Sequence, residues 1–282
     1  MKKILVPTDC SDLSGYALTL ADKLAKQSGA EIYALRVVPT PANAVFNQQG
    51  ELVEGEDFDV EATMAEQEQA HLKISDWIKK SGLSATPVVK AGNLTDQILH
   101  CVKREEIDLV VMGTHGLTGF RELIADSVTG HVVRQSSVPV LSLKCDRSDL
   151  EIKNIVFASS FEGKRPATIS FIKTLQEAFG AKLHLLRINT PGHFKTSRQL
   201  QELMQAFVKQ NELSQVEHHI YCDKDVESGI LHFTEDNNMD MISIEVEPDR
   251  LAKLFHKHIS SALVHHAYYP VLTFKNSQVK LV

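Results

Sequence analysis

The sequence repeats itself, with its matching segments in the same order in both halves. Lys3-Ile-Leu-Val recurs as Lys153-Asn-Ile-Val, Gly29-Ala-Glu-Ile-Tyr-Ala-Leu-Arg36 as Gly180-Ala-Lys-Leu-His-Leu-Leu-Arg187, Ile107-Asp108 as Met239-Asp240, and Val138-Pro-Val-Leu141 as Tyr269-Pro-Val-Leu272. The offset is about 150 residues early and about 132 late, so the second copy is shorter by roughly 19 residues. A duplicated chain of 282 residues predicts two domains of one fold, at residues 1–146 and 150–282, with a boundary in the polar stretch between them.

Short apolar runs rich in β-branched residues alternate with longer amphipathic stretches in the first copy. We expect strands over 3–6, 31–38, 86–90, 107–112 and 138–144, and helices over 13–28, 60–80, 93–104 and 127–135. This alternation predicts an α/β fold in which a parallel sheet carries helices on both faces.

The composition narrows the class of protein. With 43% hydrophobic and 23% charged residues the chain is typical of a globular protein, and its net charge of -6 argues against general nucleic-acid binding. The apolar run at the start is too short for a signal peptide, and no run of about 18 apolar residues occurs, so we predict a cytoplasmic protein with no membrane partner. The four cysteines form no C-x-x-C pair, which argues against a disulfide framework or a zinc knuckle.

A long acidic segment, residues 39–59, follows the second predicted strand. A loop of this length is either functional or mobile. It is interpreted either as a solvated excursion at the carboxyl edge of the sheet or as a lid over a ligand.

Three segments of the first copy follow strands whose carboxyl ends should meet, which is where doubly wound sheets bind ligands. They are Pro7-Thr8-Asp9, Val37-Val38 and Gly113-Thr-His-Gly116. Asp9 could accept hydrogen bonds from ribose hydroxyls, and the backbone of Val37 could pair with a base edge. Glycines let main-chain N–H groups approach phosphate oxygens, and a helix that starts at Ser127 adds a hydroxyl and further N–H donors.

These residues resemble the universal stress proteins, and the duplicated chain is similar to the tandem members of that family. Nucleotide-binding members carry G-x-x-G, nine residues, then G-S or G-T, a helix and a P-V-L strand. This chain carries Gly113-x-x-Gly116, nine residues, Asp126-Ser127, and then Val138-Pro-Val-Leu. On this basis we expect two Rossmann-like (HUP-type) domains of flavodoxin order, each with a five-stranded parallel sheet ordered 3-2-1-4-5.

The resemblance also implies ATP or another adenine nucleotide as ligand of the first domain, and stress-response binding or signalling as the function. It implies that the two domains pack as a pseudo-dimer, and we add a homodimer and an unidentified protein partner to the expected associations. The residues expected to contact the nucleotide are Pro7, Thr8, Asp9, Val37, Met112, Gly113, His115, Gly116, Asp126, Ser127, Val128 and Thr129.

Asp126 departs from the family pattern, which has glycine at this position. Two like charges about 5 Å apart repel by roughly 3 kcal/mol at an effective dielectric of about 20, or about two decades of phosphate affinity. Three interpretations stay open. Asp126 caps the helix and competes with phosphate, is a tolerated bystander, or binds a Mg²⁺ ion that bridges it to the phosphates.

The second copy has lost this pattern. Asp9 aligns with Ser159, Pro7 with Phe157 and Gly113 with Glu245, while Lys257 and His258 replace the Asp-Ser pair. We therefore expect no nucleotide site of the family type there.

Nine of the thirteen histidines lie in the second copy, including His218-His219, His256-x-His258 and His265-His266. Vicinal and i, i+2 histidines on a helix point to different faces, so they lack the i, i+4 geometry of a metal pair. They are interpreted as surface and interface residues, and no metal site is predicted. The alternative is a zinc site that joins His256 or His258 to Glu245 or Glu247.

Three functions remain in competition: a nucleotide-binding sensor, a protein-interaction module with a vestigial site, and a slow ATPase. For the last, no general base can be placed except Asp126 by guesswork.

Overall fold

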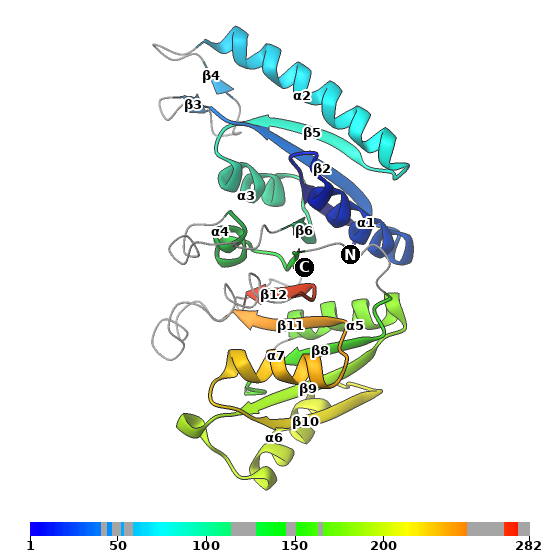
Figure 1. Cartoon of the computed structure of the whole chain (residues 1–282), viewed down its shortest axis with the longest axis vertical. Helices are drawn as coiled ribbons and strands as arrows, with labels where there is room; N and C mark the ends of the chain where they lie inside the picture. The colour runs from blue at the N-terminus through cyan, green and yellow to red at the C-terminus, as the bar shows by residue number, and fades with distance from the viewer. Residues whose placement is uncertain are drawn as a thin grey trace. The chain divides into compact units, whose positions relative to one another are not determined.

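The computed structural model describes residues 1–40, 44–46, 52–53, 59–113, 128–144, 151–162, 166–246 and 268–275. Their contacts divide them into two compact units, one up to residue 144 and one from residue 151 (Figure 1). The boundary expected at residues 146–149 lies outside the described residues.

The first unit is built on five parallel strands. They are β1 (Lys3–Pro7), β2 (Glu31–Val38), β5 (Thr86–Ala91), β6 (Leu109–Gly113) and β7 (Val140–Leu143). They lie in the order β5-β2-β1-β6-β7, which is the predicted order 3-2-1-4-5.

Four helices connect these strands. They are α1 (Asp12–Ser28), α2 (Val60–Ser81), α3 (Leu94–Arg104) and α4 (Val128–Gln135). Right-handed crossovers place α1 and α2 on one face of the sheet and α3 and α4, which pack together, on the other (Figure 1). The predicted α/β fold with helices on both faces is confirmed.

Local sequence signals set the helix ends. The side chains of Ser11, Asp59 and Asn93 accept hydrogen bonds from the first turns of α1, α2 and α3. Gly29 ends α1 with φ = 72°, a left-handed conformation that glycine adopts without a Cβ clash. These residues explain why the expected helix boundaries lie within one residue of the observed ones.

The second unit repeats the same sheet. Its strands are β8 (Asn154–Ala158), β9 (Lys182–Asn189), β10 (Val216–Cys222), β11 (Met241–Val246) and β12 (Val271–Lys275). They follow the order β10-β9-β8-β11-β12, again 3-2-1-4-5, and each neighbouring pair is parallel. The described helices are α5 (Pro166–Phe179), the short 3₁₀ helix η2 (Pro191–His193), α6 (Ser197–Gln210) and α7 (Val226–Asp236).

Both units fasten their first strand in the same way. Asp108 Oδ2 accepts hydrogen bonds from the backbone amides of Lys2 and Lys3, the latter at 3.0 Å. Asp240 Oδ2 accepts from the amides of Lys153 and Asn154 at 2.9 and 2.8 Å. Each aspartate precedes the fourth strand of its sheet, so one carboxylate ties the amino ends of two neighbouring strands together.

The connection between the second strand and the second helix differs most between the copies. It comprises residues 39–59 in the first unit and only 190–196 in the second. Within the longer segment, β3 (Val45–Phe46) and β4 (Leu52–Val53) form an antiparallel pair that was not predicted. The helix that follows is also shorter in the second unit, because α2 has 22 residues and α6 has 14.

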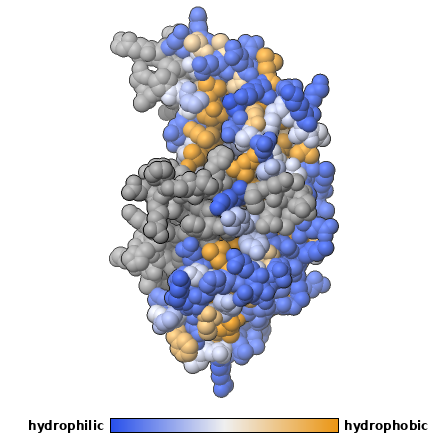
Figure 2. Space-filling model, in the orientation of Figure 1, coloured by the Kyte–Doolittle hydropathy of each residue, from blue (hydrophilic) through white to orange (hydrophobic). Residues whose placement is uncertain are grey.

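The cores follow the strand alternation. In the second unit, Val156 and Ala158 of β8 pack in the cluster that includes Ile230 and Phe233 of α7, whereas Phe157 packs against Phe207 of α6. The described surface seen in Figure 2 is mostly hydrophilic, with apolar residues in small patches. Among the described residues, no helix combines the length and apolar composition that crossing a bilayer requires.

Candidate functional site

Three of the predicted segments meet at the carboxyl edge of the first sheet. Pro7 at the end of β1 pairs with Leu35 of β2, and Leu5 pairs with Val110 of β6. Asp9, Val37 and Gly113 therefore follow or end three adjacent strands on the same edge. This is the position where open α/β sheets bind ligands.

Asp9 lies in a tight turn between β1 and α1. Its Oδ1 accepts hydrogen bonds from the Ser14 hydroxyl at 2.7 Å and from the Ser11 amide at 3.0 Å. The buried Thr8 accepts from the amide of Cys10, whose φ is 67°. The turn thus holds an exposed carboxylate in front of the first turn of α1.

The charge of Asp9 is stabilised by this turn. Partial burial by itself raises its pKa, but the hydrogen bonds from Ser11 and Ser14 outweigh burial and lower the pKa to about 2. Asp9 is therefore ionised at neutral pH and acts only as a hydrogen-bond acceptor.

Gly113 ends β6 beside the first turn of α1. A Cβ at this position would lie 2.6 Å from Leu13 Cγ and 3.2 Å from the Leu13 carbonyl oxygen. Packing against α1 therefore requires a glycine here, whether or not a phosphate binds nearby. From the sequence, Gly113 was expected only to let a phosphate approach, and this packing constraint was not predicted.

Val37 lies beyond the last β1–β2 pair while β2 continues to pair with β5, through Val37↔Lys90 and Val38↔Ala91. Among the described residues, the edge of Val37 that faces β1 has no strand partner. The pairing of this backbone edge with a base stays a prediction.

The remaining predicted residues divide into two groups. Met112 is buried in β6, and Val128 and the buried Thr129 begin the described part of α4. The second group lies outside the described residues and comprises His115, Gly116, Asp126 and Ser127.

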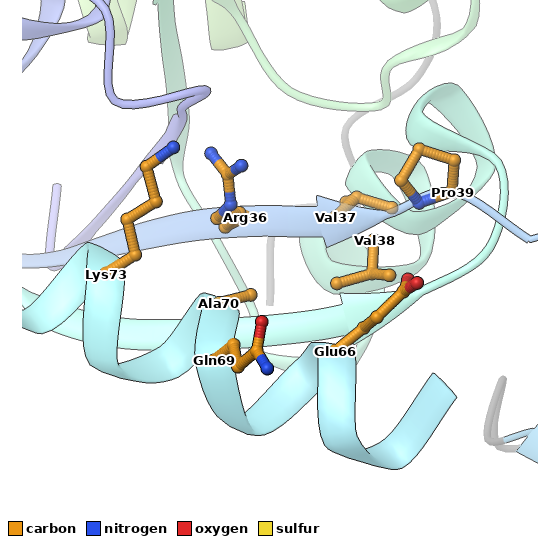
Figure 3. Close-up of a pocket in the computed structure, with 8 residues that line it drawn as sticks. All are labelled: Arg36, Val37, Val38, Pro39, Glu66, Gln69, Ala70 and Lys73. Atoms are coloured by element: carbon orange, nitrogen blue, oxygen red, sulfur yellow. The ribbon is translucent and has the colours of Figure 1, made fainter. Parts of the chain in front are cut away.

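A pocket of about 250 Å³ opens beside Val37, between β2 and α2 (Figure 3). Its polar lining was not predicted: Arg36 comes from β2, and Glu66, Gln69 and Lys73 come from successive turns of α2. Figure 3 shows Glu66 near Pro39 and Lys73 at the opposite end, beside Arg36. The volume is below the roughly 300–1,000 Å³ of typical small-molecule sites, so this pocket alone would not enclose a nucleotide.

A model of the universal stress protein family matches residues 1–144. The chain belongs to the universal stress protein family. It is 31% identical over 145 residues to the universal stress protein MJ0531 of Methanocaldococcus jannaschii, which covers 51% of this chain and 82% of that protein. It is 30% identical over 146 residues to the universal stress protein YxiE of Bacillus subtilis, covering 50% of this chain and 98% of that protein.

A solved structure matches both units together. The crystal structure of a universal stress protein from Archaeoglobus fulgidus superimposes with a TM-score of 0.73 at 20% identity and covers 98% of each chain. At that identity the likeness concerns the fold. The resemblance to universal stress proteins stated from the sequence is thus confirmed.

The strand register of the second unit shifts the correspondence between the two copies by one residue from the correspondence that the sequence comparison gave. Lys3 pairs with Glu31 in β2, and the equivalent pair is Asn154 with Lys182, not Lys153. Matching the two lysines was wrong because hydrogen-bond register, not residue identity, defines equivalence. Asp9 therefore corresponds to Ser160 and Pro7 to Ala158, rather than to Ser159 and Phe157.

The turn that follows β8 confirms the corrected alignment. Phe161, with φ = 58°, donates its amide to Ser159 Oγ at 3.1 Å, as Cys10 donates to Thr8 in the first unit. Glu245, the counterpart of Gly113, accepts a 3.3 Å hydrogen bond from Ser159. In the second unit, a glutamate side chain thus stands where the first unit has Gly113, and Ser160 stands where the first unit has the Asp9 carboxylate.

The histidines of the second unit do not all fit the helix argument. His218 and His219 lie in strand β10, where residues two apart share a face. Of the alternative zinc ligands, Glu245 is described and contacts Ser159, whereas His256, His258 and Glu247 lie outside the described residues.

Proposed function

We propose that the first unit binds an adenine nucleotide at the carboxyl edge of its sheet. The observation that carries the proposal is the convergence of Asp9, Val37 and Gly113 at the ends of adjacent parallel strands. Membership of the universal stress protein family supports the same ligand class through the sequence pattern Gly113-x-x-Gly116.

Each part of the edge would contact a different part of the ligand. The ionised Asp9 would accept hydrogen bonds from the ribose hydroxyls. The edge of Val37 that has no strand partner among the described residues would pair with the base, with the neighbouring pocket beside β2 supplying apolar contact from Val38 and Pro39. Gly113 would start the loop that carries the phosphates.

Asp126 sets the expected strength of binding. Its carboxylate replaces a glycine at the phosphate end of the motif, so we expect weak binding or a preference for fewer phosphates, unless Mg²⁺ bridges the carboxylate and the phosphates. Magnesium dependence of the affinity would separate the bridging role from simple repulsion.

Calorimetry with ATP, ADP and AMP tests the proposal on three variants beside the parent. Asp126→Gly should tighten binding by up to about 100-fold if repulsion dominates. Asp9→Ala should weaken binding by about 10–100-fold, since a hydrogen bond to a charged group contributes about 1.5–3 kcal/mol. Ser160→Ala changes the equivalent position of the second unit and should leave the affinity unchanged.

The competing function is a protein-interaction module with a vestigial nucleotide site. The packing of Gly113 against Leu13 favours it, because this glycine would persist without any ligand. If neither the parent nor Asp126→Gly binds any of the three nucleotides at millimolar concentration, the vestigial site replaces our proposal.

The only catalytic activity in this proposal is slow ATP hydrolysis. Magnesium-dependent phosphate release would be its signature. Gly113→Val is a poor test of it because the substitution would also displace α1. The signalling role, the cytoplasmic location, the protein partner and the pairing of units or chains remain predictions.

A further inference from the structure

Two histidines and a glutamate gather on the two outermost strands of the second sheet. Glu217 of β10 lies directly opposite His184 of β9, and His219 follows Glu217 on the same face of β10. Their potential ligand atoms all lie within 4.8 Å of one another. We propose that His184, Glu217 and His219 bind a divalent transition-metal ion of the zinc class.

The distances between the ligand atoms fit a metal site. His184 Nδ1 lies 3.0 Å from His219 Nε2, and Glu217 Oε2 lies 3.4 Å from the first nitrogen and 3.6 Å from the second. Bonds of about 2.0–2.1 Å to tetrahedral zinc place any two ligand atoms roughly 3.3 Å apart. A zinc ion therefore fits among these three atoms with shifts of a few tenths of an ångström.

The surroundings prepare His184 for this role. Its other ring nitrogen, Nε2, lies 3.2 Å from Asn154 Oδ1, so a proton on Nε2 is donated to the amide and Nδ1 keeps a free electron pair. Metal-binding histidines usually carry such a partner on their second nitrogen, because it fixes the tautomer and the orientation of the ring.

Burial favours the neutral, metal-binding form of both rings. His184 is 7% exposed, and burial lowers its pKa, as it does for His219, where His184 lowers it further. The ring of His219 also packs 4.8 Å from that of Phe233, on α7. At neutral pH, zinc binding would therefore release few protons from His184 and His219.

Glu217 supplies the negative charge and the open side of the site. Its Oε1 forms an ion pair with Lys182, and this leaves Oε2 for the metal. The Glu217 side chain is 43% exposed, so a fourth position is available to water. Two imidazoles and one carboxylate form a ligand set that zinc commonly takes together with a water molecule.

The ligands come from two strands, so the bound ion would fasten the edge strand β10 to β9. The site lies near the amino ends of the strands, since His184 and Glu217 are the third and second residues of β9 and β10. It involves no residue of the proposed nucleotide site and stands or falls independently of it.

Zn²⁺ and Co²⁺ titrations of the full chain, purified without a histidine tag and stripped with chelator, test the proposal. The parent should bind one equivalent with a dissociation constant in the micromolar range or below. His219→Gln and Glu217→Gln should weaken this event by at least about 100-fold, and Asn154→Ala by about 10–100-fold. The same variants should lose the rise in melting temperature that zinc gives the parent.

His218→Gln is the matched control, because His218 is adjacent, exposed and on the opposite face of β10. It should bind zinc like the parent. Glu217→Gln alters only a half-exposed side chain, so it remains informative even if a substitution at the buried His184 prevents folding. Two results would overturn the proposal and show a metal-free histidine pair. One is equal zinc affinity of the parent, His219→Gln and Glu217→Gln. The other is no binding by the parent at about 100 μM metal, which is 100-fold above a dissociation constant of about 1 μM.

Discussion

Gly113 and Leu13 approach so closely that a Cβ on residue 113 would lie 2.6 Å from Leu13 Cγ. We expect Gly113→Ala to lower the free energy of unfolding by about 1–3 kcal/mol, because α1 or the end of β6 must move. Urea denaturation measures the change. In a Leu13→Ala background the same substitution should cost clearly less.

Gly15→Ala is the control for this experiment, because it lies in α1 and its Cβ would have no neighbour within 4 Å. The substitution should stabilise the protein by about 0.5–1 kcal/mol through helix propensity. If Gly113→Ala were as well tolerated as Gly15→Ala, the close approach would have no energetic weight.

Asp9→Asn should reduce stability in a way that depends on pH. Because the folded state lowers the pKa of Asp9 from 3.8 to about 2, its contribution is complete above about pH 4 and disappears as the pH falls through 2. The carboxylate is exposed, so we expect less than about 1 kcal/mol at pH 7. Denaturation of the parent and the variant between pH 2 and 7 should show the two curves converge at the acidic end.

Asp108→Ala and Asp240→Ala should have similar effects, since each carboxylate accepts two backbone N–H groups at the start of a strand. A loss of about 1–3 kcal/mol is expected for each, because the amides lose charged partners. Circular dichroism follows both units, and the single tryptophan, Trp77 in α2, reports on the first.

Asp76→Ala is the comparison for these two aspartates. Asp76 forms an exposed ion pair with Lys80 one turn along α2, and such pairs contribute little. A loss at position 108 or 240 no larger than that at position 76 would contradict the role we assign to the two carboxylates.

The metal-free protein should lose stability on mild acidification. Burial lowers the pKa of His184 and His219 in the folded state below 6.5, so the unfolded chain binds more protons in the window below that value. Stability should therefore rise as the pH increases toward about 6.5, and His219→Gln should flatten this part of the curve. His218→Gln should keep the slope of the parent, and a parent whose curve is already flat there would contradict the assignment.

Local signals explain why most of the fold was predictable. Strand and helix periods placed the elements within one or two residues, and the structure shows the caps Ser11, Asn93 and Gly29 at the ends of these helices. The edge where Asp9 and Gly113 meet followed from the topology of parallel sheets alone. The β3–β4 pair was missed because two-residue strands have no period to detect.

Features that depend on register between distant segments were not predictable. His184 and His219 are separated by 35 positions and meet only because β9 and β10 pair with Glu217 opposite His184. The spacing Glu217-x-His219 was the available signal, but it indicates a shared face only after the segment is recognised as a strand. The same dependence produced the one-residue error between the copies.

The two anchoring aspartates, Asp108 and Asp240, lie at the amino edge of their sheets, opposite to the edge where Asp9 and Gly113 lie. Substitutions at the carboxyl edge leave these anchors intact, so one copy could change that edge and keep its fold. The replacement of Gly113 by Glu245 and of Asp9 by Ser160 records that freedom. The amino edge of each sheet thus holds its strands together through one carboxylate, while at the carboxyl edge of the first unit Gly113 adds a separate packing constraint against Leu13.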